Sequence, residues 1–300
     1  MFYSFLFGAV AFGLAAAAHR GSYQIYRFPA TGPSSDYAFS LIQTNALGST
    51  ALGVLPHLHE VHYENFFNFR GRFQLWTDKY DDENLHTPIL RCLVSFNRAD
   101  VDLFYALSSG DYTASTFTPY DPSANASSVG LSAGLIATLE GFDVYSQSTY
   151  SPRRDAVNGT APANTTGCLH PYFVAKDYGP NYLNSQSEYQ VIQPLVTGTQ
   201  SANNFTPSTI TMERVSSNAT VPTRQFPGHA AFEVLEGSLQ VEMLGEKVSL
   251  LQGDVVFIPG NTTYNYYSEV AYTKFLHVGQ GAEGLDSVLI QGVESWDSPV

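Results

Sequence analysis

Short runs of aromatic and β-branched residues, separated by glycine, proline, asparagine and serine, make up most of the chain. Runs of this kind between turn-forming residues are typical of β-strands. A short helix is expected only within residues 131–142, where apolar residues recur at helical spacing. The pattern therefore predicts an all-β protein. Its expected strands are residues 22–28, 36–43, 72–77, 89–96, 208–215, 230–237, 238–245, 253–260 and 273–279.

One succession of strands and turns occurs twice, and this weak internal repeat predicts two similar domains. In the first half, Glu64 is followed by aromatic residues, the turn glycine Gly71 and a strand. In the second half, residues 230–243 repeat this order around Gly237, and a further strand follows a Gly-Asp turn at Gly253. The repeat favours two antiparallel β-barrels or jelly rolls. We expect a signal peptide at 1–18, an N-terminal barrel at 19–150, a linker at 151–170 and a second barrel at 171–300.

Composition and charge restrict the function. Hydrophobic residues make up 44% of the chain and charged residues 14%, as in a folded globular protein. The formal net charge of −13 argues against nucleic acid and anionic membranes as partners. Motifs of nucleotide-binding proteins and serine hydrolases are missing from the sequence. Cys92 and Cys168, the two cysteines, form either one disulfide or two free thiols.

The beginning of the chain predicts export. An apolar, alanine-rich run ends in small residues near Ala17 and Ala18, which suits cleavage of a signal peptide. The alternative, a transmembrane anchor, is less favoured because the run is marginal in length. We expect a secreted glycoprotein that is free of the membrane after cleavage. Its glycosylation sequons begin at Asn125, Asn158, Asn164, Asn204, Asn218 and Asn261.

Residues 55–76 carry the densest candidate chemistry. On a strand, His57 and His59 project to one face, and a turn or bulge after His59 would bring the Glu64 carboxylate to the same point. Two imidazoles and a carboxylate suit several first-row transition metals. His62 shares the parity of Glu64, so strand geometry alone does not choose between them. A polar, solvent-facing strand is the alternative, but the apolar flanks favour a metal site because buried, unpartnered imidazoles are costly.

This spacing, HxH, four residues, Glu, six residues, Gly, matches the first signature of the cupin superfamily at His57, His59, Glu64 and Gly71. Over most of the mature chain, the sequence resembles more narrowly the fungal quercetin 2,3-dioxygenases, which are secreted bicupins that act on flavonols. The resemblance implies a bicupin fold. The segments that carry it are YRFPATGPSSDYAFSLIQTNALGSTALGVLPHLHEVHYENFFN, DLFYAL, FDVY, DAVNGTAPANT, GPNYLNSQ, FPGHAAFEV and GDVVFIPG.

The resemblance implies a single copper ion in the N-terminal barrel, with iron, manganese and nickel as alternatives. Its matching ligands are His57, His59 and Glu64. In this reading Glu64 also takes the proton of the flavonol 3-hydroxyl, and dioxygen then opens the heterocyclic ring with loss of carbon monoxide. A buried glutamate beside a cation can be poised near neutral pH for this task.

The implied partners are a small-molecule flavonol and dioxygen. The substrate-binding positions of the family fall on Tyr26, Ile42 and Phe66, with Ile42 standing where the family has a methionine. Aromatic and apolar side chains suit a flat flavonol because they can stack against its rings.

The second barrel is expected to hold no metal. The positions that match the ligands carry Thr223, Gln225, Ala230 and Tyr264, which are poor ligands as a set. His229 is interpreted as a structural residue. We therefore expect the second barrel to act as a structural or dimerisation partner, with a homodimer as the assembly.

A third histidine ligand is expected from the same N-terminal barrel. Residues 108–123 begin with Gly-Asp but lack the proline and histidine that should follow, so we interpret them as a false match. His86 resembles the third ligand of the family because it lies in a His-Thr context soon after an asparagine. The interval from Glu64 to His86 is shorter than in the family, which predicts an N-terminal barrel truncated by a strand or more. The histidines without motif context, interpreted as incidental, are His19, His170 and His277.

Two explanations of the short interval stay open: a degenerate relative that holds copper poorly, or a gene model that lost part of an exon. Three functions follow. The first is a copper-dependent extracellular flavonol dioxygenase. The others are a catalytically impaired or non-catalytic secreted bicupin, and a manganese oxidoreductase of the oxalate type, against which the flavonol-dioxygenase segments argue.

Overall fold

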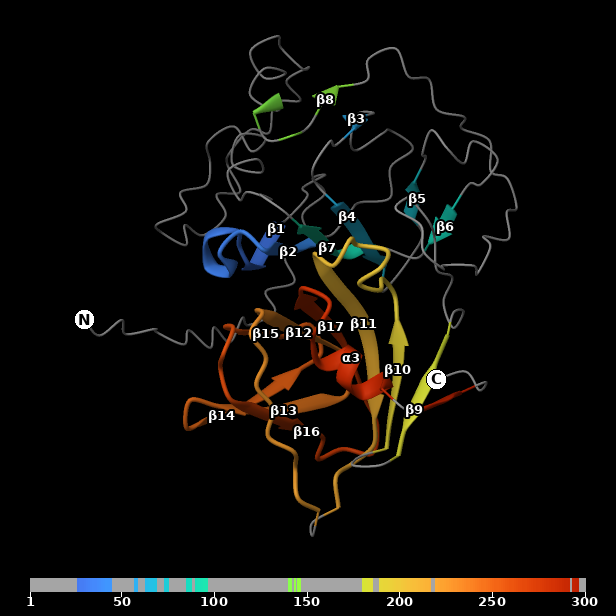
Figure 1. Cartoon of the computed structure of the whole chain (residues 1–300), viewed down its shortest axis with the longest axis vertical. Helices are drawn as coiled ribbons and strands as arrows, with labels where there is room; N and C mark the ends of the chain where they lie inside the picture. Colours follow the sequence, from blue (N-terminus) through green and yellow to red (C-terminus); the bar gives the residue numbers. More distant parts are fainter. Residues whose placement is uncertain are drawn as a thin grey trace, which may run out of the picture.

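The computed structural model of the chain is built almost entirely of antiparallel strands (Figure 1). Its described residues are 26–44, 57–58, 63–68, 73–75, 85–87, 90–96, 140–141, 143, 145–146, 180–185, 189–216, 219–291 and 293–296.

The first half contains one four-stranded sheet and two smaller ones. The four-stranded sheet has the order β1 (Tyr26–Ala30), β2 (Phe39–Thr44), β7 (Leu90–Phe96) and β4 (Tyr63–Asn68), and a 3-10 turn, η1 (Pro33–Ser35), joins β1 to β2. The two-stranded sheets pair β3 (His57–Leu58) with β8 (Tyr145–Ser146), and β5 (Phe73–Leu75) with β6 (Leu85–Thr87).

The second half forms a barrel from a larger and a smaller sheet. The larger sheet has the order β15 (Val255–Ile258), β12 (Ala230–Glu236), β17 (Thr273–Gln280), β11 (Phe205–Met212), β10 (Gln190–Pro194), β9 (Tyr182–Asn184) and β18 (Glu294–Ser295). The smaller has the order β14 (Glu246–Leu251), β13 (Ser238–Met243) and β16 (Tyr264–Tyr267). Helix α3 (Leu285–Ile290) lies beside β9 and β10.

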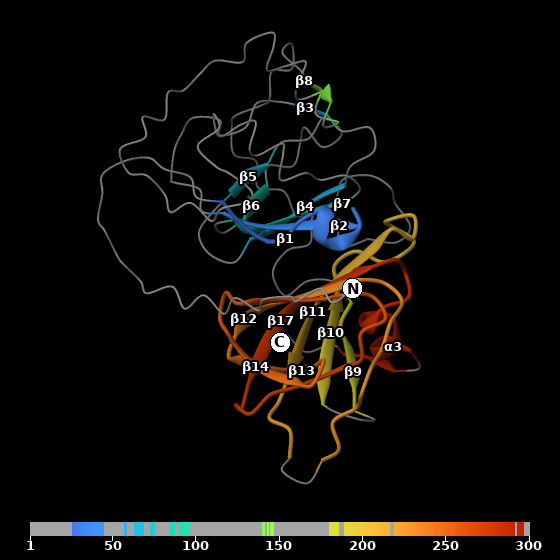
Figure 2. The same ribbon diagram turned by 90° about the vertical axis from the view of Figure 1, so that its left-hand side faces the viewer.

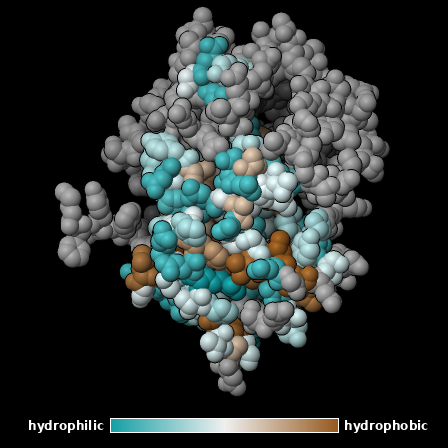
Figure 3. Space-filling view, in the orientation of Figure 1, coloured by the Kyte–Doolittle hydropathy of each residue, from teal (hydrophilic) through white to brown (hydrophobic). Residues whose placement is uncertain are grey.

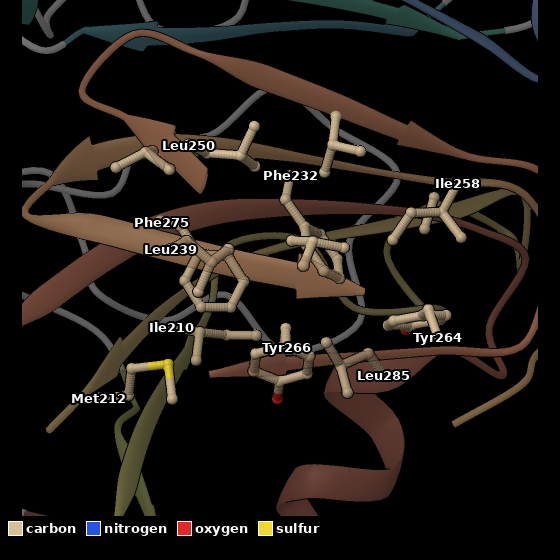
Figure 4. Packing of buried hydrophobic residues seen from close by; sticks show 14 of the residues in the cluster. Ile210, Met212, Phe232, Leu239, Leu250, Ile258, Tyr264, Tyr266, Phe275 and Leu285 are labelled. Atoms are coloured by element: carbon tan, nitrogen blue, oxygen red, sulfur yellow. The ribbon is translucent and has the colours of Figure 1, made fainter. Parts of the chain in front are cut away.

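An aromatic core fills the space between these two sheets (Figure 4). Phe232 of β12 is fully buried at its centre, and its ring lies 5.8 Å from that of Tyr264, 5.7 Å from that of Tyr266 and 5.2 Å from that of Phe275. Tilted and edge-on ring pairs at such distances add to the free energy that burial alone contributes. The second barrel is therefore closed around a dense apolar interior.

The structure explains why glycine occupies position 237. It joins β12 to β13 at φ +76°, and a Cβ there would collide with the carbonyl oxygen of Tyr272. Only glycine meets both conditions at low cost. The turn that the repeat predicted at Gly237 is confirmed.

The two halves pack together through an apolar layer between the four-stranded sheet and the larger sheet (Figure 2). The ring of Phe39 lies 6.1 Å from that of Phe257, and the ring of Tyr63 lies 5.4 Å from that of Phe205. We call this layer the interface cluster. Its buried members are Ala30, Phe39, Leu41, Val196, Phe205, Ala231, Leu276 and Val278, with Ala38, Tyr63, Phe67, Leu195, Leu235, Val255 and Phe257 packed against them.

Each expected strand has a counterpart in the structure, and the all-β prediction is confirmed. Among the elements that the pattern did not identify are β6, β8, β9, β10, β14, β16, β18 and α3. The expected helix at 131–142 and the linker at 151–170 fall almost wholly outside the described residues, so the domain boundaries stay a prediction. In the described part, helices are too short or too polar to cross a membrane. On the coloured part of the surface in Figure 3 most residues are hydrophilic, and the apolar residues form separate patches, one of them near α3.

Candidate active site

The four-stranded sheet has two faces of different character. On β2, Phe39 and Leu41 belong to the interface cluster, whereas Ser40 and Ile42 alternate with them and are each 1% exposed. Because successive side chains of a strand point to opposite faces, Ser40 and Ile42 lie on the face away from the second barrel.

Strand β4 repeats this alternation. Tyr63 and Phe67 pack against the interface cluster, so Glu64 and Phe66 lie on the opposite face, where both are half-buried. We call the face that carries Ser40, Ile42, Glu64 and Phe66 the site face.

Strand register aligns the predicted site residues in cross-strand rows. Ile42 and Phe66 both pair with Leu93 of β7, and Ser40 and Glu64 both pair with Ser95. Directly opposed residues of an antiparallel pair share one face and have neighbouring Cβ atoms. The structure therefore places Ile42 and Phe66 in one row, on either side of Leu93, and Glu64 in the neighbouring row on the same strand as Phe66.

Tyr26 joins this arrangement by its position in the ladder. It pairs with Thr44, which is two residues beyond Ile42 on β2. The register thus places Tyr26, Ile42 and Phe66 in two adjacent rows.

The predicted histidine ligands lie on other sheets. His57 of β3 pairs with Ser146, and His86 of β6 pairs with Gln74. Both views show β3 on the side of the four-stranded sheet that is opposite the second barrel, which is the side of the site face, whereas Figure 1 shows β6 beside that sheet (Figures 1 and 2). His59 falls outside the described residues. Within the described ranges, no three His, Cys, Asp or Glu side chains come together as a metal-binding group.

Comparison with known proteins decides the family. No protein-family model matches the chain. A quercetin 2,3-dioxygenase from Aspergillus japonicus is 44% identical to it over 314 residues, which cover 92% of this chain and 89% of the relative. This chain belongs to the quercetin 2,3-dioxygenase family. The predicted class, a dioxygenase with the bicupin fold, is confirmed.

Solved structures match about a third of the chain. A putative ethanolamine utilization protein Q from Salmonella typhimurium is 21% identical with a TM-score of 0.29, covering 33% of this chain and 76% of that one. A cupin superfamily protein from Desulfitobacterium hafniense is 14% identical with a TM-score of 0.27, covering 32% and 81%.

This quercetin 2,3-dioxygenase homologue is shorter than its relative within the matched region. The alignment extends over 314 residues, and the chain has 300. The relative therefore has residues there without a counterpart in this chain. This agrees with a shortened segment, although much of its predicted place between Glu64 and His86 lies outside the described residues.

In the second barrel, two of the positions that correspond to the ligands, Ala230 and Tyr264, belong to the core, and the other two, Thr223 and Gln225, are exposed. Ala230 opens β12 and belongs to the aromatic core, and Gln225 Nε2 donates a hydrogen bond to the carbonyl oxygen of Asn261 at 2.8 Å. Tyr264 is 2% exposed, and burial raises the pKa of its hydroxyl. These side chains occupy the barrel interior or its turns.

The interpretation of His229 as structural is confirmed. The backbone N–H of Gly260 donates to its Nδ1 at 3.1 Å, so the Nε2–H of the neutral ring donates to Asp36 Oδ2 at 3.2 Å. The imidazole also stacks on Phe257, with ring centres 5.4 Å apart. His229 thus links the second barrel to the turn after η1.

Sequence reasoning missed the position of His277. This residue is fully buried on β17, with Nδ1 3.4 Å from Ser208 Oγ and 3.9 Å from Asp286 Oδ1. Burial lowers the pKa of its imidazole, an effect that the nearby Asp286 carboxylate partly opposes. Its parity with Phe275 was the signal that could have placed it inside the second barrel.

Proposed function

We propose that this protein is a copper-dependent dioxygenase that opens the heterocyclic ring of flavonols such as quercetin and releases carbon monoxide. The observation that carries the proposal is the site face, where one carboxylate, Glu64, shares a face of the sheet with the apolar residues Ile42 and Phe66. A flavonol is flat and weakly acidic, so a site for it should combine a base for its hydroxyl with apolar side chains that contact its rings. The 44% identity to a quercetin 2,3-dioxygenase supports this substrate class.

His57, His59, His86 and Glu64 would hold the metal. Three imidazoles and one carboxylate suit copper, and iron, manganese and nickel accept the same donor types. The chemistry of the half-buried Glu64 fits this donor set. When bound, copper would lower the pKa of the flavonol hydroxyl and offer dioxygen an inner-sphere position.

The residues of the chain would prepare the substrate. Glu64 would accept the proton of the flavonol 3-hydroxyl, for which a half-buried carboxylate is suited because burial disfavours its charged form and a cation favours it. Phe66, Ile42 and Tyr26 would border the flat ring system, with Phe66 offering an aromatic contact and Ile42 an apolar one. Enclosure by apolar groups would also limit access of water.

The experiment is metal analysis of the purified protein combined with a quercetin assay that measures oxygen uptake and carbon monoxide. We expect one copper per chain, and we expect Glu64→Gln to lower kcat by a factor of about 10²–10⁴, as for loss of a general base. Glu246→Gln, an exposed residue on β14, is the matched control and should leave kcat unchanged. A copper-loaded protein that consumes no flavonol would refute the proposal.

A second candidate is a bicupin impaired by the shortened segment, and the additional residues of the relative favour it. In that case His86 would not complete the site, and His86→Ala would leave copper affinity unchanged. If His86 is a ligand, the same variant should weaken copper binding at least about tenfold. Manganese loading with oxalate as substrate tests the third function.

Export is part of the proposal, and the sequons support it. Asn261 is exposed in a turn at φ +60°. By contrast, Asn204 is half-buried and its Nδ2 donates to the carbonyl oxygen of Ser201 at 2.8 Å. We expect a glycan on Asn261 before Asn204, which glycopeptide mass spectrometry of protein from the culture medium would test.

A further inference from the structure

A hydrogen-bond network ties the back of the site sheet to the second barrel. Arg27 of β1 and Gln43 of β2 are cross-strand partners, and Arg27 Nη1 donates to Gln43 Oε1 at 2.9 Å. Gln43 Nε2 in turn donates to Glu233 Oε1 of β12 at 2.8 Å. Both side chains also reach the carbonyl oxygen of Gly253, at 2.9 Å from Arg27 and 3.1 Å from Gln43. Two strands of one barrel are thus bound to one turn and one strand of the other.

The chemistry of the network leaves one arrangement of the Gln43 amide. A guanidinium can only donate and a carboxylate can only accept, so the amide oxygen must face Arg27 and the amide nitrogen must face Glu233. The chain of bonds therefore runs from cation to anion, and each bond polarises the next. Glu233 is 3% exposed, so much of this interaction takes place away from water.

The network lies directly behind the predicted substrate residues. Tyr26 precedes Arg27 in the chain, and Ile42 precedes Gln43. The ladder between β1 and β2 is irregular after Arg27, where the register shifts before Ala30. A bulge loosens the local ladder and redirects side chains, so β1 depends here on other contacts to hold its place.

We propose that Arg27, Gln43 and Glu233 are positioning residues that hold β1 and β2 so that Tyr26 and Ile42 keep their places for the flavonol. The inference rests on the proposed function. It gives the second barrel a defined part in the reaction, because Glu233 and the Gly253 carbonyl supply anchor points from a closed, well-packed barrel. The residues act through the backbone and do not touch the substrate.

The test exchanges the amide and the carboxylate. Gln43→Glu sets two carboxylates against each other, and we expect the KM for quercetin to rise about tenfold with a smaller change in kcat. Adding Glu233→Gln restores a donor facing an acceptor and should return KM to within about twofold of the parent value. If Gln43→Glu acted only by destabilising the protein, adding the second substitution would not restore KM.

Asp36→Ala is the matched control. It removes the bond to His229, which also joins the two halves but starts from a turn that carries none of the predicted substrate residues. This variant should leave KM unchanged. Amide hydrogen exchange provides a readout besides activity: exchange in β1 and β2 should rise in Gln43→Glu, return in the double variant and stay unchanged in Asp36→Ala.

The outcomes separate this inference from the proposed function. If the parent protein turns over quercetin while Gln43→Glu and Asp36→Ala have equal KM values, the positioning role is refuted and the function stands. If the parent consumes no flavonol, the proposed function fails. In that case amide hydrogen exchange alone tests whether the network holds β1 and β2. Equal exchange rates for these strands in Gln43→Glu and in the parent protein would refute this role.

Discussion

Two equivalent strands of this protein, β4 in the first half and β12 in the second, have different tasks. Glu64 precedes the turn glycine Gly71 by seven residues, and Ala230 precedes Gly237 by the same interval. The following aromatic residues, Phe66 and Phe232, also correspond. In β12, Ala230 and Phe232 point into the aromatic core, whereas in β4 Glu64 and Phe66 occupy the site face.

The difference lies in what each interior is built to hold. Phe232 is surrounded by aromatic rings and Ala230 adds only a methyl group, so the second barrel gains packing energy and offers no ligand there. At the same place β4 has a carboxylate, which a closed apolar core would not tolerate without a partner. The repeated order of strands therefore provides one interior for stability and one for chemistry.

Substitutions at Ala230 and Glu64, the first pair of corresponding residues, should have the largest effects. We expect Ala230→Glu to prevent folding of the second barrel or to destabilise it by several kcal/mol, because it buries a charge without a partner. Glu64→Ala should leave the free energy of unfolding nearly unchanged while abolishing flavonol turnover. Urea unfolding with parallel quercetin assays measures both. Equal stability losses in the two variants would contradict the comparison.

Replacing Phe232 and Phe66, the second pair of corresponding residues, by alanine should separate an effect on stability from an effect on substrate binding. Phe232→Ala should cost about 3 to 5 kcal/mol of stability, because its fully buried ring contacts three other aromatic rings. Phe66→Ala should cost much less and should raise the KM for quercetin, since Phe66 is only half-buried. A Phe66→Ala variant with unchanged KM would remove Phe66 from the proposed substrate site.

Local pattern was sufficient for strands such as β12, β13 and β17, because their alternation and bounding turns lie within a few residues. Helix α3 escaped detection because its six residues are too few for a helical period to stand out. Strand β16, with the sequence YNYY, shows its alternating burial only once it pairs with β13. Both elements depend on contacts with distant parts of the chain.

The candidate site, like the fold, was predictable from the sequence only in part. Motif spacing and resemblance identified Glu64, Ile42 and Phe66, but their common face depends on the register of β2, β7 and β4. The bond from Gln43 to Glu233 spans 190 residues and leaves no signal in either segment. A sequence therefore indicates which residues carry chemistry more readily than it indicates what holds them in place.

The buried His277 should make the second barrel sensitive to acid. Burial keeps the pKa of His277 below its value of 6.5 in the unfolded chain, so the unfolded state binds more protons as the pH falls. Stability should therefore be fully present above pH 6.5 and decline as the pH drops toward the lowered pKa. His277→Phe should flatten this decline, measured by urea unfolding between pH 7.5 and about 5. An unchanged pH profile would show that other groups control acid stability.

The smallest effect should come from the contact between the two halves at the turn after η1. His229 and Asp36 are 3.2 Å apart, but the Asp36 side chain is 88% exposed, so water screens the interaction. Asp36→Asn keeps an oxygen that can accept from His229 Nε2, and it should leave the melting temperature within error of the parent. Asp36→Ala should lower the melting temperature slightly, because it leaves the N–H to water alone. A large loss in either variant would mean that the two halves depend on this turn, and not mainly on the interface cluster, for their association.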